Sequence, residues 1–141
     1  MATVRELAER SIELYNAGAL EELVSMLAED AVDITPRGKN TGREAISERL
    51  HGERLAFPDK RLTLRHLTVE GDTAVMECDF AATHSGPLPM PDGTQLPPTG
   101  QHVTFSVVIV SEMHEGLATE VRTYFDQLPM LMQLGVVSAP G

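Results

Sequence analysis

Apolar residues in the first part of the chain recur at helical spacing, which predicts three consecutive helices. Thr3 and Glu6 have the spacing of a capping box, so the first helix is expected to begin after Thr3. A second pattern of this kind starts at Thr41 and is expected to open the third helix, which Pro58 ends. A short strand over residues 31–35 is expected between the second and third helices.

From residue 61 onward, the spacing of apolar residues changes to two, which is typical of strands. This pattern predicts an antiparallel meander of four strands, over residues 61–70, 73–84, 102–114 and 117–125. A short closing helix is expected over residues 127–134. The segment over residues 85–100 holds five of the nine prolines, which lack the backbone N–H of a strand ladder, so we expect a long loop there.

Helices followed by a meander predict an α+β fold, in which the N-terminal helices pack on a curved antiparallel sheet and enclose one apolar pocket. A chain of 141 residues has the usual size of one domain. We therefore expect a single domain over residues 1–141.

The chain carries 11 Lys and Arg residues against 21 Asp and Glu residues, which gives a net charge of −10. This charge would repel phosphate backbones and anionic lipid headgroups, so we expect neither a nucleic acid nor a membrane as a partner. The first ten residues lack the apolar core of a signal peptide, and the single Cys78 forms no disulfide within the chain. These features predict a cytoplasmic protein.

The five histidines show no close spacing of the kind that signals a zinc site. The sequence also has no glycine-rich dinucleotide motif, no P-loop and no G-x-S-x-G nucleophile elbow. We therefore expect no metal and no cofactor.

Four candidate site residues come from the apolar face of the second strand and its surroundings. His84 ends that face, where burial could tune an imidazole near neutral pH, although a core-edge histidine bonded to the backbone is an alternative. Phe80 on the same face and His102 at the start of the next strand are candidate substrate-binding residues. Tyr15, near the inner end of the first helix, could hydrogen-bond a ligand or could be a core-edge tyrosine.

The last strand has a polar row on one face, formed by Glu120, Arg122, Tyr124 and Asp126. If this row lines a pocket, Asp126 would lie beside the closing helix, where burial raises the pKa of a carboxylate and suits it to acid–base work. Asp126 also has the position of an N-cap for that helix, and the spacing leaves both interpretations open. Arg122 could orient a substrate oxygen together with Tyr124, or pair with Glu120 at the surface.

The order of these elements and several strings resemble the SnoaL-like polyketide cyclases, or ester cyclases, of the nuclear transport factor two-like superfamily. The strings are SIELYNAGAL (residues 11–20), AFPD (56–59), THSG (83–86), PPTGQHVTF (97–105) and YFDQLPMLMQLG (124–135). The resemblance implies a cone with a deep apolar cavity, commonly assembled as a homodimer, and a role in antibiotic biosynthesis.

The resemblance further implies a lyase or isomerase that closes a ring in a small apolar or aromatic substrate by intramolecular aldol chemistry, without metal or cofactor. Asp126 matches the pocket aspartate that acts as acid and base in such cyclases. Tyr15 matches a pocket-lining tyrosine, and His84 lies in the recurring T-H-x-G string. Either residue could stabilise the enolate.

Two positions differ from the family pattern. Ile34 follows Asp33 where many relatives have a histidine, and Arg122 stands where a tryptophan is common. The altered polar set would also fit an epoxide opening of the limonene-epoxide-hydrolase type, with Arg122, Asp126 and either Asp33 or Asp79 activating water. A ligand-binding module without catalysis is the third expectation.

Overall fold

The structure is a computed structural model that describes residues 2–90 and 92–138. Its helices are α1 (Val4–Ala17), α2 (Leu20–Ser25), α3 (Arg43–Ala56) and α4 (Gln127–Gln133). Its strands are β1 (Leu27–Thr35), β2 (Gly38–Thr41), β3 (Arg61–Glu70), β4 (Thr73–Thr83), β5 (Leu88–Pro89), β6 (Gln95–Leu96), β7 (His102–His114) and β8 (Leu117–Tyr124). None of the helices in the described ranges is long and apolar enough to cross a bilayer.

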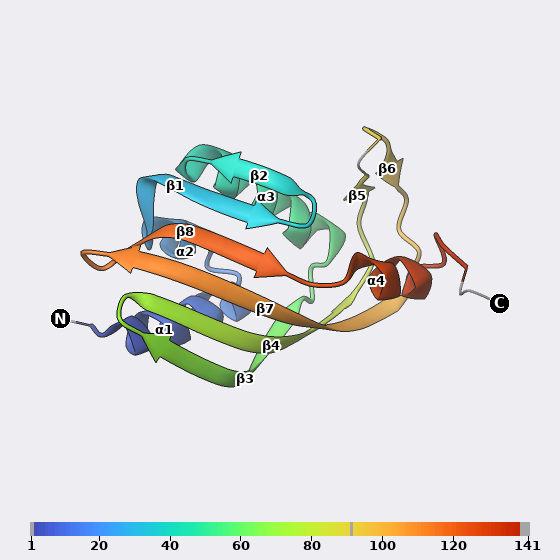
Figure 1. The fold of residues 1–141 in the computed structure, drawn as a ribbon. Helices are drawn as coiled ribbons and strands as arrows, with labels where there is room; N and C mark the ends of the chain where they lie inside the picture. Colours follow the sequence, from blue (N-terminus) through green and yellow to red (C-terminus); the bar gives the residue numbers. More distant parts are fainter. Residues whose placement is uncertain (1, 91, 139–141) are drawn as a thin grey trace.

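Six strands form one curved sheet in the order β2-β1-β8-β7-β4-β3 (Figure 1). The predicted meander is confirmed, because β4 pairs antiparallel with β3 and β7, and β7 pairs antiparallel with β8. The expectation of a wholly antiparallel sheet needs correction. Strand β1 runs parallel to β8, with Val32 opposite Glu120 and Ile34 opposite Arg122, so the sheet is mixed.

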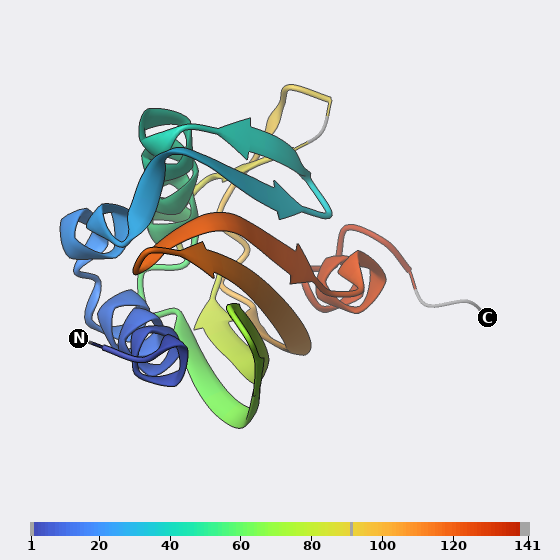
Figure 2. The ribbon, with the colours of Figure 1, turned by 60° about the vertical axis from the view of Figure 1, so that its left-hand side comes forward.

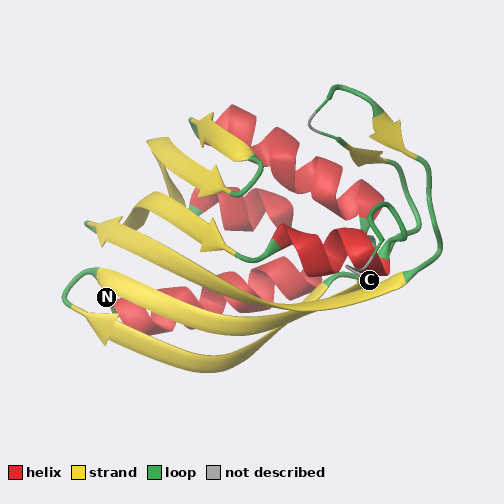
Figure 3. Cartoon of the chain, turned by 45° about the vertical axis from the view of Figure 1, so that its right-hand side comes forward, coloured by secondary structure: helices red, strands yellow, loops and turns green. Residues whose placement is uncertain are grey.

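Helices α1, α2 and α3 lie together on one side of the curved sheet, and α4 lies apart from them at the end of β8 (Figure 2). The short strands β5 and β6 pair with each other and project from the end of the molecule at which α4 lies (Figure 3). The apolar core forms where helix α1, through Ala8 and Ile12, meets the inner face of β4, through Met76 and Phe80.

The local signals in the sequence had mixed outcomes. The capping box of Thr3 and Glu6 is confirmed, because both of its hydrogen bonds are present. The second one is wrong: Thr41 belongs to β2, and α3 follows Gly42, which has no side chain to cap the helix. Strand β1 begins at Leu27, earlier than predicted, and the proline-rich segment contains the short β5–β6 pair.

Helix α4 is held in place by two contacts. Asp126 is its N-cap, and its Oδ1 accepts a hydrogen bond of 3.0 Å from the Leu128 N–H. Gln133 exchanges two hydrogen bonds of 2.7 and 2.8 Å with the backbone of Thr104 on β7. These contacts place Met130 in a buried position against the end of the sheet.

Candidate functional site

A cavity of about 640 Å³ lies between the N-terminal helices and the inner face of the sheet. This volume is within the usual range for a site that binds a small organic molecule. Much of its wall is apolar and comes from both layers, including Leu7, Ile12, Met76, Val107, Ile109 and Met130. An apolar molecule of moderate size would therefore be well sheltered from water.

An aromatic stack forms one wall of this cavity. The rings of Phe80 and Phe105 stack at a centroid distance of 4.7 Å, and those of Phe105 and Phe125 stack at 4.8 Å. Phe57 meets Phe80 edge-on at 5.8 Å. All four rings line the cavity, so they give it a flat, rigid surface suited to an aromatic or polyene ligand.

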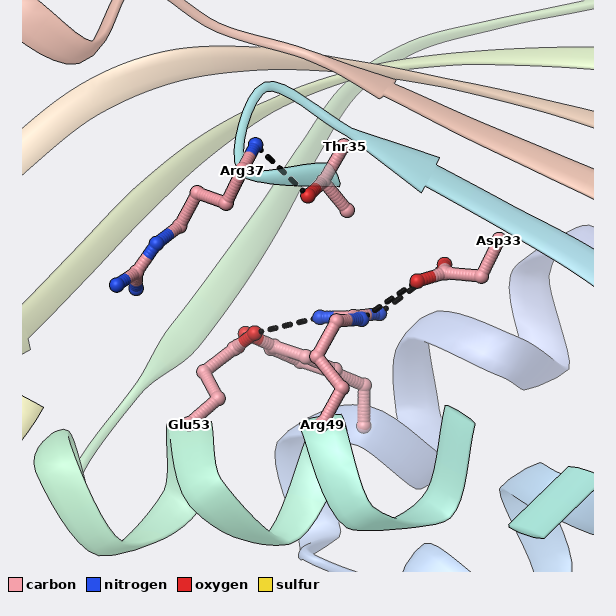
Figure 4. A network of polar contacts seen from close by, with 6 residues as sticks. Asp33, Thr35, Arg37, Arg49 and Glu53 are labelled. Atoms are coloured by element: carbon pink, nitrogen blue, oxygen red, sulfur yellow. Dashed lines mark hydrogen bonds and ion pairs between the residues drawn. The ribbon is translucent and has the colours of Figure 1, made fainter. Parts of the chain in front are cut away.

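A chain of polar contacts also lies on the cavity wall. Arg49 of α3 binds Asp33 of β1 with two hydrogen bonds, from Nε at 2.6 Å and from Nη2 at 3.1 Å. Its Nη1 donates to Glu53 Oε2 at 3.1 Å. The other carboxylate oxygen of Glu53 accepts a short hydrogen bond from the Tyr15 hydroxyl of α1. Figure 4 shows the Asp33, Arg49 and Glu53 side chains converging from the strand and the helix.

Local structure explains why these side chains meet. Arg49 and Glu53 are four residues apart on α3, so they lie one above the other on the same helix face. Asp33 shares the inner face of β1 with the buried Ala31. Tyr15 is on the last turn of α1, and its ring lines the cavity.

Burial makes this cluster electrostatically sensitive. Asp33 is only 2% exposed, and a buried carboxylate is tolerated because the Arg49 guanidinium pairs with it. Burial alone would lower the pKa of Arg49, but the charges of Asp33 and Glu53 outweigh it and hold the pKa above its ordinary value. Burial, followed by the charge of Glu53, raises the pKa of the Tyr15 phenol. Tyr15 therefore stays protonated and can donate a hydrogen bond.

The turn between β1 and β2 brings a further cation to the cavity. Arg37 lines it, and its backbone N–H donates to Thr35 Oγ1 at 3.1 Å (Figure 4). Desolvation lowers the pKa of Arg37 from its ordinary value.

Of the residues singled out from the sequence, Tyr15 and Phe80 line the cavity. His84 does not: it is fully buried, and its Nδ1 accepts a hydrogen bond of 3.1 Å from the Thr99 N–H, as the core-edge alternative has it. The neighbouring Gly86 crosses the end of α3 so closely that a Cβ there would lie 1.8 Å from the Leu55 carbonyl oxygen. The T-H-x-G string therefore fixes the loop after β4.

The polar row of the last strand faces away from the cavity. Val121, Thr123 and Phe125 line it, so the alternate residues point to the other side of the sheet. There Arg122 pairs with Glu112 at 2.9 Å and with Glu120. Tyr124 and Asp126 are both exposed.

The remaining candidates also lie outside the cavity. His102 is exposed, with its Nδ1 3.3 Å from Thr83 Oγ1. Asp79 pairs with Arg65 at 2.5 Å, and both side chains are largely exposed. The residues expected for epoxide opening, Arg122, Asp126 and either Asp33 or Asp79, are therefore not brought together. Asp33 is paired with Arg49 in the cavity, Asp79 with Arg65, and Arg122 with Glu112 on the other side of the sheet.

Arg49 and Glu53 were missed by sequence reasoning, although a weak signal existed for both. They flank Leu50 and continue the buried side of α3 that Ile46 begins. A charged pair at i, i+4 next to an apolar helix face is common on surfaces, so the spacing alone does not identify a site. Within residues 2–90 and 92–138, no group of three or more His, Cys, Asp or Glu side chains is arranged to hold a metal ion.

A scan against protein-family models matches residues 5–134 to the model described as SnoaL-like polyketide cyclase. A search of curated proteins finds no match. Among solved structures, IdmH from Streptomyces antibioticus, a proposed polyketide cyclase, is 27% identical with a TM-score of 0.79, and the alignment covers 96% of this chain and 100% of IdmH.

Two further solved structures are similar over most of their length. TsrD from Streptomyces laurentii is 25% identical with a TM-score of 0.80, covering 95% of this chain and 96% of TsrD. AclR from Streptomyces galilaeus, a proposed hydroxylase, has a TM-score of 0.83 at 22% identity, covering 98% of this chain and 84% of AclR. At that identity, the AclR likeness shows the fold alone.

Proposed function

Because this chain belongs to the SnoaL-like polyketide cyclase family, we propose that it is a cofactor-independent cyclase or isomerase of small polyketide-like molecules. The observation that carries the proposal is the Asp33–Arg49–Glu53–Tyr15 chain of contacts on the wall of an otherwise largely apolar cavity. A carboxylate and a phenol in contact provide a base and an acid at one place. The likeness to IdmH supports the polyketide-like substrate class.

In the proposed reaction, Glu53 takes a proton from the carbon next to a carbonyl group of the substrate. Once Glu53 is protonated, the single O–H of Tyr15, which donates to that carboxylate in the free protein, donates instead to the enolate oxygen that forms. The enolate carbon then attacks a second carbonyl of the same molecule, which forms the new carbon–carbon bond. The proton held by Glu53 returns to the resulting alkoxide, so the enzyme ends as it began.

Arg49 and Asp33 support this acid–base pair. Arg49 holds one oxygen of Glu53, and Asp33 fixes the guanidinium through two parallel hydrogen bonds. This arrangement orients the Glu53 carboxylate, with Tyr15 at its other oxygen. The aromatic stack on the cavity wall would hold the substrate chain folded, so that the two reacting carbons stay close.

This proposal replaces Asp126 with Glu53 as the base. Asp126 is exposed and caps α4, and the cavity lining does not include it. The catalytic roles that the resemblance implies for Asp126 and His84 stay predictions. They are tested below against Glu53 for the same substrates.

A second candidate function, the opening of an epoxide, is favoured by one observation. Arg49 lies between two carboxylates, which are the residue types that limonene-epoxide-hydrolase-like proteins use to activate water. In that reaction, Glu53 would take a proton from the attacking water, and Tyr15 would protonate the oxygen of the opened ring. Oxygen from labelled water would then enter the product, whereas ring closure by an aldol reaction incorporates none.

The test compares Glu53→Gln with Asp126→Asn in a turnover assay on linear and partly cyclised polyketide esters, followed by mass spectrometry. Glu53→Gln should reduce turnover by about 10²- to 10⁴-fold, the usual contribution of a positioned acid or base. Asp126→Asn should leave turnover unchanged, because asparagine is an equally good N-cap. Melting temperatures of both variants show whether the fold is preserved.

The reverse result would overturn the choice of base. If Asp126→Asn abolishes turnover with an unchanged melting temperature while Glu53→Gln remains active, Asp126 is the acid–base residue. Tyr15→Phe removes only the hydroxyl, so it tests the proposed acid and should also lower turnover. His84→Gln, tested beside it, addresses the other catalytic residue that the resemblance implies.

We also propose that the protein is a homodimer, as the resemblance implies, and that it is cytoplasmic, as the sequence features predict. An exposed apolar surface in the last part of the chain supports the dimer. It is formed by Tyr124, Leu128, Val136 and Val137. Light scattering on the purified protein measures the assembly. A variant with Leu128→Glu should shift the protein to monomer if this surface is the interface.

A further inference from the structure

We propose that Lys60 is a positioning residue of the site, whose buried ammonium holds a positive charge against the ring of Tyr15 and favours negative charge on the Tyr15–Glu53 pair. The inference rests on the proposed function, in which that pair is the acid and base. Lys60 lies between α3 and β3, directly before the first residue of β3, where the sequence offers no functional motif.

The geometry is unusual for a lysine. Its Nζ lies 3.2 Å from the centroid of the Tyr15 ring, and Lys60 is only 6% exposed. Among the described residues, Nζ has no hydrogen-bond partner. Tyr15 lines the cavity and Lys60 does not, so the ammonium acts on the site through the face of the Tyr15 ring.

Such an arrangement is costly for the fold. A lysine at the edge of a core normally extends its charged end into water, and burying an ammonium without a hydrogen bond is unfavourable. The ring face of Tyr15 compensates in part through a cation–π contact. A methionine of similar length would fill the same space without this cost, so the charge is best explained by a role in the site.

The charged groups around Lys60 define what the ammonium does. Glu53 attracts it, and Arg54 and Arg49 repel it. The same Glu53 and Arg49, together with Cys78, act on Tyr15. Lys60 and Arg49 thus bring positive charge to the Tyr15–Glu53 pair, where the proposed reaction places a negative charge on the bound enolate.

Lys60 is also poised to lose its charge near neutral pH. Burial lowers the pKa of Lys60 to about 8, with Glu53 acting in the opposite direction. The unfolded chain binds this proton up to a pKa of about 10.4, so the folded state holds fewer protons between the two values. The contribution of Lys60 to the free energy of unfolding therefore increases as the pH rises through this window.

The first experiment measures the coupling without substrate. The chain has two tyrosines and no tryptophan, so ¹³C-tyrosine labelling gives two sets of ring signals, and Tyr124→Phe assigns those of Tyr15. The Tyr15 signals should move with a midpoint near pH 8, and this movement should disappear in Lys60→Met. Tyr15 signals that stay fixed between pH 6.5 and 9.5 in the wild-type protein would overturn the proposal.

The second experiment measures turnover and stability of Lys60→Met and Lys60→Arg. Lys60→Met should lower kcat by about tenfold or more and raise the melting temperature at pH 7, with the gain shrinking towards pH 10. Lys60→Arg keeps a cation on the ring and should restore kcat, with no loss of activity above pH 8, because arginine stays protonated. Loss of both kcat and stability in Lys60→Met, without rescue by arginine, would mean a structural role and would overturn the proposal.

The two experiments separate the two proposals. If the Tyr15 signals follow Lys60 but Glu53→Gln keeps full turnover, the proposed function has failed and the contact between Lys60 and Tyr15 stands. If Glu53→Gln is inactive while Lys60→Met has wild-type kcat and an unchanged pH profile, the proposed function stands and the role of Lys60 has failed.

Discussion

Two arginines in this molecule each lie between two carboxylates, one on the cavity wall and one on the outer side of the sheet. The side chains of Arg49 and Arg122 are almost equally exposed, at 27% and 25%. Their partners differ: the side chains of Asp33 and Glu53 are 3% and 23% exposed, whereas those of Glu112 and Glu120 are 45% and 35% exposed. The difference teaches that the burial of the carboxylate, more than that of the arginine, separates the two groups.

The outer group illustrates how little a pattern of charges says about a site. The hydrogen bonds that Arg122 donates to Glu112 and Glu120 raise the pKa of Arg122 above its ordinary value, and the same contact lowers the pKa of Glu112. Water reaches these carboxylates, however, and screens the charges. The inner group faces a cavity from which a bound apolar ligand would displace water. Its charges would then be screened less and would interact more strongly with the ligand.

The largest effect is expected from Arg49→Met. It leaves the buried Asp33 without its guanidinium, and breaking a buried ion pair in this way costs about 3–5 kcal/mol of unfolding free energy. Urea unfolding measures the change. Arg49→Met with Asp33→Asn should recover part of the loss, because no unpaired charge then remains in the core. A loss below 1 kcal/mol in Arg49→Met would erase the distinction between the two groups.

A smaller and pH-dependent effect is expected at His84, which is buried but lies outside the cavity. Burial lowers the pKa of His84 below its ordinary value. Below a pH of about 6.5, the ordinary pKa of histidine, the unfolded chain binds this proton more readily than the folded protein. The free energy of unfolding should therefore fall as the pH decreases through this region.

The measurement at His84 is a series of urea unfolding curves between pH 5.5 and 7.5 on wild type and on His84→Gln. Glutamine can still accept the hydrogen bond of the Thr99 N–H. The slope against pH should be shallower in the variant. An identical slope in both proteins would show that His84 is not a source of the acid sensitivity.

The smallest effect is expected from Arg122→Met. Its partners remain in water when the guanidinium is removed, so neither carboxylate becomes a buried unpaired charge. Unfolding free energy and turnover should both stay close to wild type. A change as large as that of Arg49→Met would indicate that the outer face is covered in the native assembly, and light scattering on both proteins would show this.

The sequence predicted the local elements well where the cause is local. The capping box at Thr3 fixes the start of α1, and the meander follows from the alternating residues of β4 and its neighbours. The start of α3 was predicted at Thr41, but the pairing of β2 with β1 takes that residue into the sheet. The pairing of the strands, and not the capping pattern, therefore decides where α3 begins.

The site was predicted less well than the fold. Tyr15 and Phe80 were identified from their inward positions, and both line the cavity. The sequence left open whether the polar row of β8 lines a pocket, and in the structure the more apolar residues Val121 and Phe125 line the cavity instead. The resemblance drew attention to Asp126, whose most evident role in the structure is that of an N-cap.

The sequence by itself determined the four helices, strand β1 and the four strands of the meander in their order, together with the family and the apolar cavity. Only the tertiary structure decided that β1 runs parallel to β8 and that Asp33 meets Arg49, Glu53 and Tyr15. The physical reason is the range of the interactions. Helix caps and strand alternation act over a few residues, whereas these four side chains come from β1, α1 and α3 and meet only after the helices pack on the sheet.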